Sequence, residues 1–380
     1  MTGRSVYITR MSKYLPNDPV SNNEIEDILG RINELPSRAK PLILRNNQIK
    51  SRYYALDRKG NSTHTNAEMT GRAVEGLFDS EFGLADVDVL SCGTSTPDQL
   101  LPSHAAMVHG ILGRKPLEIN STTGACSAGI QALKFGHLSV LAGSARNAVC
   151  TGSDRFSKWM LARYFKEEAI KIAQLDKDGI IAFDKDFLRF MLSDGAAAAL
   201  LQPTPNASGL SLRIEWIEQR SYANELETCM YAGGIKTTDG ALIGWTELEQ
   251  EEWTSQSVFA FKQDTRLLGD FIVRKGGELL SSIVKDKKLD VSTITYFLPH
   301  LSSQYFGPRI ERELRAIGLD IPLTKWFTNL SWVGNVGAAS AHLMLEEIFN
   351  SGKLKKGDTL LVMVPESARF NYGYILLTVV

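Results

Sequence analysis

The chain of 380 residues repeats one pattern of strands, loops and helices along its length. The apolar segment DVDVLSCGTSTPD, which begins at Asp86, aligns with DVSTITYFLPHLSS, which begins at Asp290, 204 residues later. A second pair, NSTTGACSAG from Asn120 and NLSWVGNVGAAS from Asn329, aligns 209 residues apart. An internal repeat of this length favours a body built from two similar halves over two unrelated domains.

Each half predicts alternating strands and helices. Both small-residue segments lead into an apolar helix that should close at a glycine, Gly143 in the first half and Gly352 in the second. The apolar strands NAVCTGSD and TLLVMVPES follow, and each half ends on another strand, GAAAALLQ and YGYILLTVV. This alternation predicts an α/β fold with helices on both faces of the sheets. Two such halves stacked together give a layered αβαβα body.

The boundary between the halves is predicted at QPTPNASG, residues 202–209, where Pro, Asn, Ser and Gly interrupt the apolar pattern. We therefore divide the chain into residues 1–205 and residues 206–380. The longest departure from the repeat is an insertion in the first half, about residues 155–190, with mixed charge and many aromatic residues. Insertions of this length in a compact fold are commonly lids or substrate-binding segments.

Charge and composition argue against several functional classes. The 42 Lys and Arg residues balance 43 Asp and Glu residues, so the net charge of -1 favours neither nucleic acid nor an anionic membrane as partner. No segment approaches the roughly 20 apolar residues that span a bilayer, and the N-terminal MTGRSVYITRMSKYLP lacks the apolar core of a signal peptide. We therefore expect a cytoplasmic protein. The four cysteines form no CxxC pair and no zinc spacing, and no phosphate-binding loop is evident, so we expect no disulfide, metal or cofactor.

Cys126 stands among small residues where the first of the repeated helices begins. Unpaired N–H groups and the helix dipole stabilise an anion there, so we expect the thiol pKa to fall from about 8.5 towards neutrality. The small side chains of Gly124, Ala125 and Ser127 let an acyl group reach the sulfur and let backbone N–H groups face an oxyanion. From this stretch alone, a nucleophile and a buried core cysteine are equally good interpretations.

His300 and Asn335 complete a candidate site through the repeat. His300 ends the apolar strand ITYFLPH, and Asn335 aligns with Cys126 between the two halves. A neutral imidazole at a strand end can bond a reacting carbonyl, and an amide donor can hold an enolate or thioester oxygen. Taken singly, an edge histidine is more often structural, and asparagine is also a good helix cap. Pseudo-twofold packing of the halves would bring Cys126, His300 and Asn335 into one pocket.

The motifs GACSAG, LPH and GNVGAAS, in this order and spacing, resemble the 3-oxoacyl-acyl-carrier-protein synthase III group of thiolase-fold condensing enzymes, and the likeness covers nearly the whole chain. Within that group, ILRNNQIKSRYYALD, THTNAE and LSCGTSTPDQLLPSHAAMVHG look like the bacterial enzymes that form dialkylresorcinols and related cyclohexanediones, precursors of flexirubin-type and stilbene-type products. The resemblance implies that Cys126 accepts the acyl group, and that His300 and Asn335 stabilise the donor's thioester oxygen. It also implies a homodimer, and a separate aromatising enzyme downstream for a resorcinol product.

Two segments depart from the pattern of the group. Val336 and Gly337 replace the Thr and Ser that usually follow the asparagine, and PESARFNYG stands where the group has a glycine triplet, an aromatic residue and a later glycine. The backbone of Ala368 is then expected to complete the oxyanion hole together with that of Cys126. Glu366 becomes a candidate for extra proton transfers in ring formation, although a surface or salt-bridged glutamate is the commoner case.

The resemblance also addresses the substrates. Leu101 stands where an aromatic residue often reaches across the dimer into the partner's tunnel, so leucine would leave more room for a bulky acyl chain, and Trp159 is expected to line the same tunnel. The tryptophan-bearing pattern that binds coenzyme A in primer-using synthases is not evident around PSRAKPLILRNN. We therefore expect acyl-carrier-protein thioesters ahead of coenzyme A thioesters.

An acyl carrier protein is acidic, so a local basic patch should guide it. Two segments are candidates, although solvated surface charge is the commoner role for any one of these residues. The first patch comprises Arg38, Lys40, Arg45, Lys50 and Arg52, and the second comprises Arg155, Lys158, Arg163 and Lys166.

The likeness to resorcinol-forming enzymes predicts a ketosynthase and cyclase. It would condense a β-ketoacyl thioester with a second acyl group held on Cys126 and close a dialkyl cyclohexane-1,3-dione ring. One alternative is a decarboxylating 3-oxoacyl-acyl-carrier-protein synthase III of fatty-acid initiation. An alternative of another class is a non-catalytic acyl-binding partner subunit, against which the joint presence of Cys126, His300 and Asn335 argues.

Overall fold

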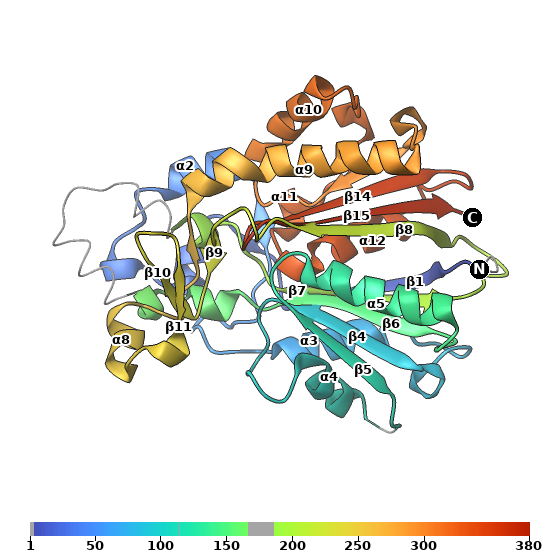
Figure 1. Cartoon of the computed structure of the whole chain (residues 1–380). Helices are drawn as coiled ribbons and strands as arrows, with labels where there is room; N and C mark the ends of the chain where they lie inside the picture. Colours follow the sequence, from blue (N-terminus) through green and yellow to red (C-terminus); the bar gives the residue numbers. More distant parts are fainter. Residues whose placement is uncertain (1–3, 114, 166–185) are drawn as a thin grey trace.

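The strands of the two halves join into one mixed sheet that folds around a central pair of helices (Figure 1). The computed structural model describes residues 4–113, 115–165 and 186–380. In these ranges the main sheet has the order β13-β14-β15-β8-β1-β7-β6-β4-β5. In chain order, its strands are β1 (Tyr7–Tyr14), β4 (Val89–Thr94), β5 (Glu118–Thr123), β6 (Ala148–Asp154), β7 (Gly195–Gln202), β8 (Leu212–Ser221), β13 (Tyr296–Pro299), β14 (Thr359–Glu366) and β15 (Asn371–Val379).

Helices form three layers around these strands. The central layer contains α5 (Ala128–Ala142) and α12 (Ser340–Phe349), with β14, β15 and β8 on one side and β7, β6, β4 and β5 on the other (Figure 1). Helices α9 (Thr265–Lys287) and α10 (Gly307–Ala316) cover one outer face, and α3 (Asn66–Glu75) and α4 (His104–Leu112) cover the other. This arrangement confirms the predicted αβαβα layering.

The strand order at one end of the sheet repeats at the other. β4 runs parallel to β5 and β6, and β7 and β1 follow antiparallel. β13 runs parallel to β14, and then β15 and β8 follow antiparallel. Beyond β13, Trp326 forms a parallel bridge to Phe297, in the position that corresponds to β5 in the first half. The two parts are not separate sheets, because β1 and β8 pair at Tyr7 with Arg213 and at Ile8 with Leu212. The domain boundary at residue 205 stays a prediction, and it falls between β7 and β8.

The central helices end differently from each other. α5 ends at Gly143, which has φ of +75°, as its sequence predicts. α12 ends at Phe349, before the predicted Gly352, because Asn350 closes it: the Asn350 amide donates to the Met11 carbonyl at 3.2 Å and to the Glu346 carboxylate at 3.0 Å. An asparagine whose side chain bonds outside the helix offers the chain an alternative to another helical turn.

Shorter elements gather at the end of the molecule away from the two termini (Figure 1). The described parts of the predicted insertion form 3-10 turns at Ser157–Met160 and Ala162–Phe165 and a helical turn at residues 186–189, whereas residues 166–185 lie outside the described ranges. No helix within those ranges is long and apolar enough to cross a bilayer. The remaining short elements are β2 (Val20–Ser21), α1 (Ile25–Leu29), α2 (Lys40–Asn47), β3 (Ser51–Arg52), β9 (Met230–Tyr231), β10 (Gly234–Lys236), β11 (Leu242–Gly244), α8 (Gln250–Ser255), β12 (Lys262–Gln263) and α11 (Leu330–Val333).

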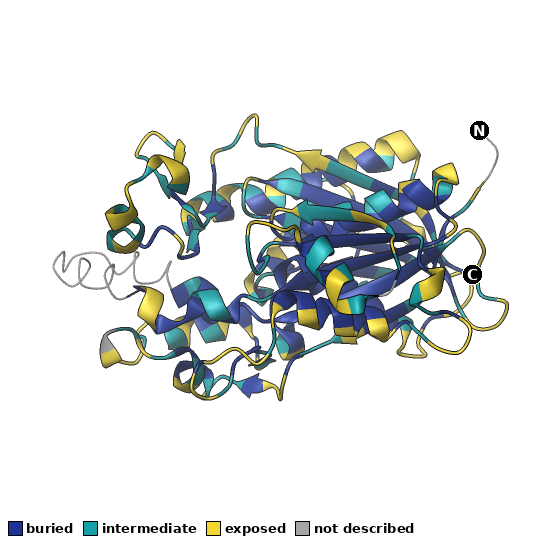
Figure 2. Cartoon of the chain, turned by 90° about the horizontal axis from the view of Figure 1, so that it is seen from below, coloured by how far each residue is buried: buried dark blue, intermediate teal, exposed yellow. Residues whose placement is uncertain are grey.

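Small residues let the central elements approach each other closely. Figure 2 shows the strands buried and the exposed residues on the outer helices and loops. A Cβ on Gly129 of α5 would lie 2.2 Å from the Ala338 carbonyl oxygen, and one on Gly152 of β6 would lie 2.4 Å from the same atom. Both glycines are therefore needed for the loop before α12 to pack against α5 and β6.

The buried carboxylate of Asp154, the last residue of β6, joins three segments. It accepts backbone N–H bonds from Ser95 at 2.7 Å, Thr96 at 3.0 Å and Ala338 at 2.7 Å. The hydroxyl groups of Ser95 and Thr96 donate to it at 2.8 and 2.9 Å. Burial raises the pKa of this carboxyl to about 6, although the hydrogen bonds oppose that rise. One side chain thus fixes the loop after β4 and the loop that carries Asn335.

Replacing Asp154→Asn should lower the free energy of unfolding at pH 7 by about 2–4 kcal/mol, because the amide nitrogen would face N–H and O–H donors and leave them unpaired. Urea unfolding followed by circular dichroism measures this. The loss should be larger at pH 4 than at pH 7: the folded pKa lies above the unfolded one, so the stability that Asp154 contributes falls as the pH rises through about 6.

The matched control is Arg146→Ala, which removes an exposed ion pair with Asp88 near the opposite end of β6. Its effect should stay below about 1 kcal/mol. An Asp154→Asn loss no larger than that of the control would contradict the joining role of Asp154.

Candidate active site

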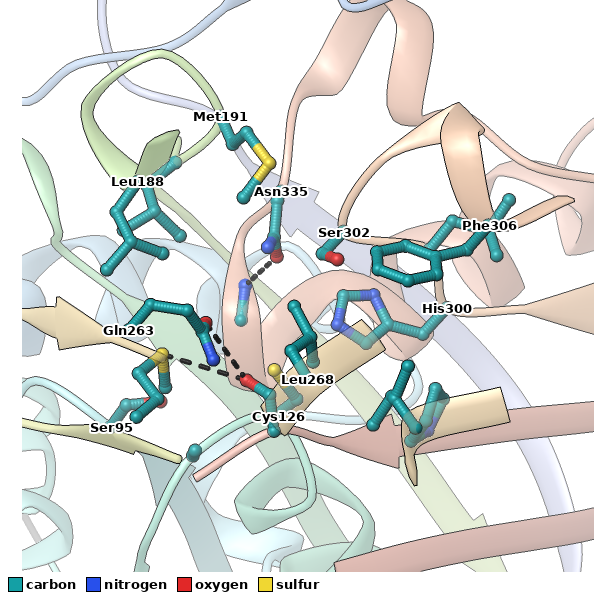
Figure 3. A pocket seen from close by; sticks show the side chains of 18 of the residues that line it. Ser95, Cys126, Leu188, Met191, Gln263, Leu268, His300, Ser302, Phe306 and Asn335 are labelled. Carbon is teal, nitrogen blue, oxygen red and sulfur yellow. Dashed lines mark hydrogen bonds between the residues drawn. The ribbon is translucent and has the colours of Figure 1, made fainter. Parts of the chain in front are cut away.

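Cys126, His300 and Asn335 line one cavity (Figure 3). Cys126 lies in the turn before α5, His300 directly follows β13, and Asn335 lies between α11 and α12. All three are buried, with 9%, 3% and 4% of their surface exposed. The cavity has a volume of about 40 Å³, and most of the rest of its wall is apolar. The structure thus brings together the three residues that the repeat aligns, and their catalytic roles stay predictions.

Hydrogen bonds hold the side-chain oxygen and the backbone of Asn335, and they leave its side-chain NH2 group free to donate. Its Oδ1 accepts the Gly337 N–H at 2.9 Å, its own N–H donates to the Met191 carbonyl at 3.1 Å, and its carbonyl accepts the Ser193 N–H at 2.8 Å. Gly337 has φ of +52°, and a Cβ there would lie 2.3 Å from Asp154 Oδ2, so this departure from the group's usual Ser is required by the local packing. The Asn335 Nδ2 group has no acceptor among the described residues and can donate to an oxygen in the cavity.

His300 is a neutral imidazole at the edge of the sheet. Its backbone N–H donates to the Met363 carbonyl at 2.8 Å, which continues the pairing of β13 with β14. Burial lowers the pKa of its ring to about 4, so the ring is uncharged at neutral pH. No described residue hydrogen-bonds to the ring, and a neutral imidazole has one nitrogen donor and one acceptor. It can therefore donate to the same kind of oxygen as Asn335.

The thiol of Cys126 does not have the lowered pKa that its place before a helix predicts. Burial raises this pKa, and the carboxylates of Glu366 and Asp154 raise it further. The prediction was wrong first because the thiol is buried, and second because a carboxylate already lies at the start of α5: Glu366 Oε2 accepts the Ser127 N–H at 3.2 Å. Glu366 is 239 residues away along the chain, so the local sequence around Cys126 carries no sign of it.

Glu366 ends β14 and is 7% exposed. Its carboxylate also accepts the Ser127 hydroxyl, whose oxygen accepts a bond from the Asn371 amide at 2.9 Å. Burial raises the pKa of the carboxyl group. No basic side chain in the described part of the chain forms an ion pair with it, so it is neither a surface nor a salt-bridged glutamate. Its part in proton transfer stays a prediction.

Ala368 does not line the cavity. Its carbonyl accepts the N–H groups of Cys229 at 2.8 Å and Met230 at 3.2 Å, which ties the loop after β14 to β9. The neighbouring residues Pro365 and Ser367 line the cavity instead. The oxyanion-hole role of Ala368 stays a prediction that the observed lining does not favour.

Leu101 and Trp159 lie away from the Cys126 cavity. Leu101 is 85% exposed in the loop before α4. Trp159 lines a second cavity of about 470 Å³. Its ring packs edge-on to Phe261 at 5.7 Å between centroids, and Phe261 packs edge-on to Phe156, which lines the Cys126 cavity, at 5.5 Å. A row of three aromatic rings therefore lies between the two cavities.

The second cavity is cationic. Arg155 forms an ion pair with Asp98 at 3.2 Å, but Lys158 and Arg163 have no acidic partner among the described residues. Aromatic side chains of α8 and its neighbouring loops, Trp253 and Phe259, complete much of the wall. These cations are part of the second predicted basic patch, whose fourth member, Lys166, lies outside the described residues.

The first predicted basic patch is smaller than the sequence suggests. Arg52 is fully buried and donates to Asn22 Oδ1 at 2.9 Å and to the Phe190 carbonyl at 3.2 Å, so it presents no charge to a partner. Lys40 forms an ion pair with Glu26 at 2.9 Å. Charge spacing along the chain could not show that α2 and β3 turn these side chains inward. Arg38, Arg45 and Lys50 remain exposed.

Several polar residues at or beside the site were missed from the sequence, among them Ser95, Asp154 and Gln263. Ser95 lines the cavity, whereas Thr96, which the repeat aligns with His300, is buried and bonded to Asp154. The sequence shows β4 and β6 as apolar strands that end on polar residues, and this signal could have identified both Ser95 and Asp154. Gln263 also lines the cavity, but β12 has two residues and no pattern identifies it.

Residues 284–376 match the family model for the C-terminal part of 3-oxoacyl-[acyl-carrier-protein] synthase III. Over 350 residues the chain is 25% identical to a beta-ketoacyl-[acyl-carrier-protein] synthase III of Clostridium perfringens, and the match covers 92% of each chain.

Solved structures show the same fold. OleA of Xanthomonas campestris, determined with bound lauric acid and lauroyl-CoA, has a TM-score of 0.74 at 16% identity over 99% of each chain. The tetronic acid condensing enzyme AbyA1 has a TM-score of 0.74 at 19% identity over 98% of this chain and 99% of its own. The chain thus has the thiolase-like fold of these proteins and is similar over nearly its whole length to the 3-oxoacyl-acyl-carrier-protein synthase III condensing enzymes.

Proposed function

We propose that the protein is a ketosynthase that joins two acyl thioesters through an acyl group held on Cys126. The observation that carries the proposal is that Cys126, His300 and Asn335 line one buried, largely apolar cavity. A sulfur nucleophile and two hydrogen-bond donors, the His300 ring and the Asn335 amide, are the groups that thioester condensation needs. The similarity to synthase III proteins supports the same reaction class.

In the first stage, the sulfur of Cys126 attacks the carbonyl carbon of an acyl thioester. A new carbon–sulfur bond forms, the bond from that carbon to the carrier sulfur breaks, and the carrier leaves as a thiol with the proton of Cys126. The apolar wall suits the acyl chain, and burial excludes water that would hydrolyse the acyl-enzyme.

In the second stage, a carbanion attacks the acyl group. We propose a β-ketoacyl thioester as donor, because its carbon between two carbonyls loses a proton easily. His300 and Asn335 would each donate to the enolate oxygen, where negative charge develops, so their bonds strengthen in the transition state. The carbanion bonds to the acyl carbon, the bond from that carbon to the sulfur of Cys126 breaks, and the sulfur takes up the proton that the donor carbon has lost. A second carbon–carbon bond would close the cyclohexane-1,3-dione, either by a Michael-type addition, which moves a proton from the attacking carbon to the acceptor, or by a second condensation, which releases the carrier as a thiol. A separate aromatising enzyme would convert the dione to a resorcinol.

The second cavity supports a thioester on a phosphate-bearing arm. Acyl carrier protein and coenzyme A both present their thioester on such an arm, and Lys158 and Arg163 offer charges that described acids do not neutralise. The aromatic row of Trp159, Phe261 and Phe156 leads from this cavity to the one that contains Cys126. We propose that the arm of the thioester lies here.

A decarboxylating synthase of fatty-acid initiation is the second candidate, favoured by the similarity to synthase III proteins. The purified protein should be incubated with an acyl thioester plus either a β-ketoacyl or a malonyl carrier thioester, with mass spectrometry of the intact protein and of the products. We expect an acyl mass on Cys126 and a cyclic dione with the β-ketoacyl donor. Efficient use of malonyl thioester with no cyclic product would establish the decarboxylating reaction instead.

Variants separate the two stages. Cys126→Ala should gain no acyl mass, whereas Asn335→Ala and His300→Ala should still become acylated but form product about 10²–10³-fold more slowly, since each removes one donor to the enolate. Cys92→Ala, at a buried cysteine outside the cavity, is the control and should behave like wild type. Acyl mass that persists in Cys126→Ala would overturn the proposal and leave the non-catalytic binding subunit.

The edge of the sheet supports the proposed homodimer. β5 is an outer strand of the main sheet and pairs only with β4, Ile119 on it is 38% exposed, and Leu100 and Leu101 in the loop before α4 are 71% and 85% exposed. A strand with one free edge, on a surface that also exposes leucines, is suited to pairing with a second copy. Such a dimer would also place Leu101 at the partner's surface.

The molar mass in solution, measured by light scattering, should be twice the 42.0 kDa of one chain. Ile119→Arg should weaken the dimer by at least tenfold in Kd, because it places a charge on the strand that is proposed to pair with the second copy. Leu242→Arg, at a similarly exposed residue on β11, should leave the mass unchanged. A wild-type protein that stays at the mass of one chain at micromolar concentration would exclude a stable dimer.

A further inference from the structure

The carboxylate of Glu366 accepts hydrogen bonds from the backbone on both sides of Cys126. Its Oε2 accepts the N–H of Ser127 at 3.2 Å and the Ser127 hydroxyl, and the backbone of Ala125 gives a further hydrogen bond. Unpaired N–H groups at a helix start usually stabilise an anion, such as a thiolate, near the first turn. Here the carboxylate of Glu366, at the end of β14, accepts the hydrogen bond from the N–H of Ser127, so this N–H is not available to stabilise a thiolate of Cys126.

The titratable side chains that face Cys126 are either acidic or uncharged. Glu366 faces it from the end of β14 and Asp154 from the end of β6, and both raise the proton affinity of the sulfur. His300, after β13, is uncharged. The other side chains around Ser127 are the amides of Gln131 and Asn371, and the residues that line the cavity include no Lys or Arg.

A second negative charge beside a buried carboxylate is unfavourable, because little solvent screens the repulsion. We propose that Glu366 is a positioning residue that keeps Cys126 as a neutral thiol until an acyl thioester enters the site. The synthase III group typically has a glycine triplet in place of PESARFNYG, so this carboxylate distinguishes the chain from the group.

A neutral thiol changes how the proposed acyl transfer proceeds. The S–H bond of Cys126 must break as the new carbon–sulfur bond forms, and the departing carrier sulfur receives the proton, so no thiolate accumulates in the empty site. Thiolates are the forms of cysteine that alkylating agents and oxidants attack. The empty site should therefore be protected against both. The inference rests on the proposed function only in taking Cys126 as the acyl acceptor.

The test is the rate at which iodoacetamide alkylates Cys126, measured by peptide mass spectrometry between pH 6 and 10. Glu366→Gln keeps an oxygen acceptor for Ser127 and removes the charge. We expect alkylation of Cys126 at pH 7.5 to become at least tenfold faster, which corresponds to a fall of about one unit in the thiol pKa. The pH at which the rate reaches half its maximum should fall by a similar amount.

Glu346→Gln is the matched control. Glu346 is a buried carboxylate on α12, paired with Lys13, and it is not among the groups that shift the pKa of Cys126. Its alkylation profile should equal that of wild type, and circular dichroism should show both variants folded. An unchanged profile in a folded Glu366→Gln protein would overturn the proposal. No acyl substrate is used, so failure of the proposed function would leave this result intact.

A second measurement needs no substitution at Glu366. Thiolate absorbs near 240 nm, and the difference between wild type and Cys126→Ala across the pH range reports ionisation of this one thiol. We expect no ionisation up to the pKa of an ordinary cysteine, about 8.5. A thiolate that forms at or below that pH in wild type would overturn the proposal even if Glu366→Gln failed to fold.

Discussion

The hydrogen bonds of Asp154 hold the candidate site together. A buried carboxylate at the end of β6 accepts N–H bonds from Ser95 and Thr96 on one side and from Ala338 on the other. Without these bonds, the loop of Asn335 would lose the hydrogen bond that joins its Ala338 N–H to a side chain of the first half of the chain. Burying a charge is costly, and the raised pKa of about 6 shows that the donors repay that cost only in part. The buried charge thus lowers the stability of the fold, and in return its hydrogen bonds fix the end of β6 relative to the loop that contains Asn335.

The same carboxylate acts on Cys126, and so does that of Glu366. Each has a local purpose: Asp154 joins loops, and Glu366 caps the start of α5. Together they place two acids near the thiol, in a cavity whose described lining includes no Lys or Arg. The helix dipole, which alone would stabilise a thiolate, is therefore outweighed by nearby charges and by burial. The charges around Cys126 depend more on the residues that the fold brings together than on the dipole of the helix that follows it.

Much of the fold could be predicted because an internal repeat implies that both halves have the same order of strands and helices. The aligned segments gave the layers, the strands β4, β6, β13 and β14 and the glycine that ends α5, and they placed Cys126, His300 and Asn335 in one cavity. What could not be predicted depends on contacts between distant segments. Glu366 meets Ser127 across 239 residues, Arg52 turns inward to the Phe190 carbonyl, and Gln263 reaches the cavity from a two-residue strand. None of these contacts leaves a periodic pattern in the sequence.

The polar and apolar parts of the cavity differ in how far they can adapt. Asn335 is held by three hydrogen bonds and Asp154 fixes the backbone around it, so the donors keep their positions. A volume of about 40 Å³ is well below the roughly 150 Å³ of an engineered cavity that binds benzene, so the acyl chain of the proposed substrate would enter only if the apolar wall moves. Met191 and Met230 belong to that wall, and methionine changes shape at little cost. Under the proposed function, fixed donors beside a deformable wall would let one arrangement of Cys126, His300 and Asn335 accept acyl chains of different length.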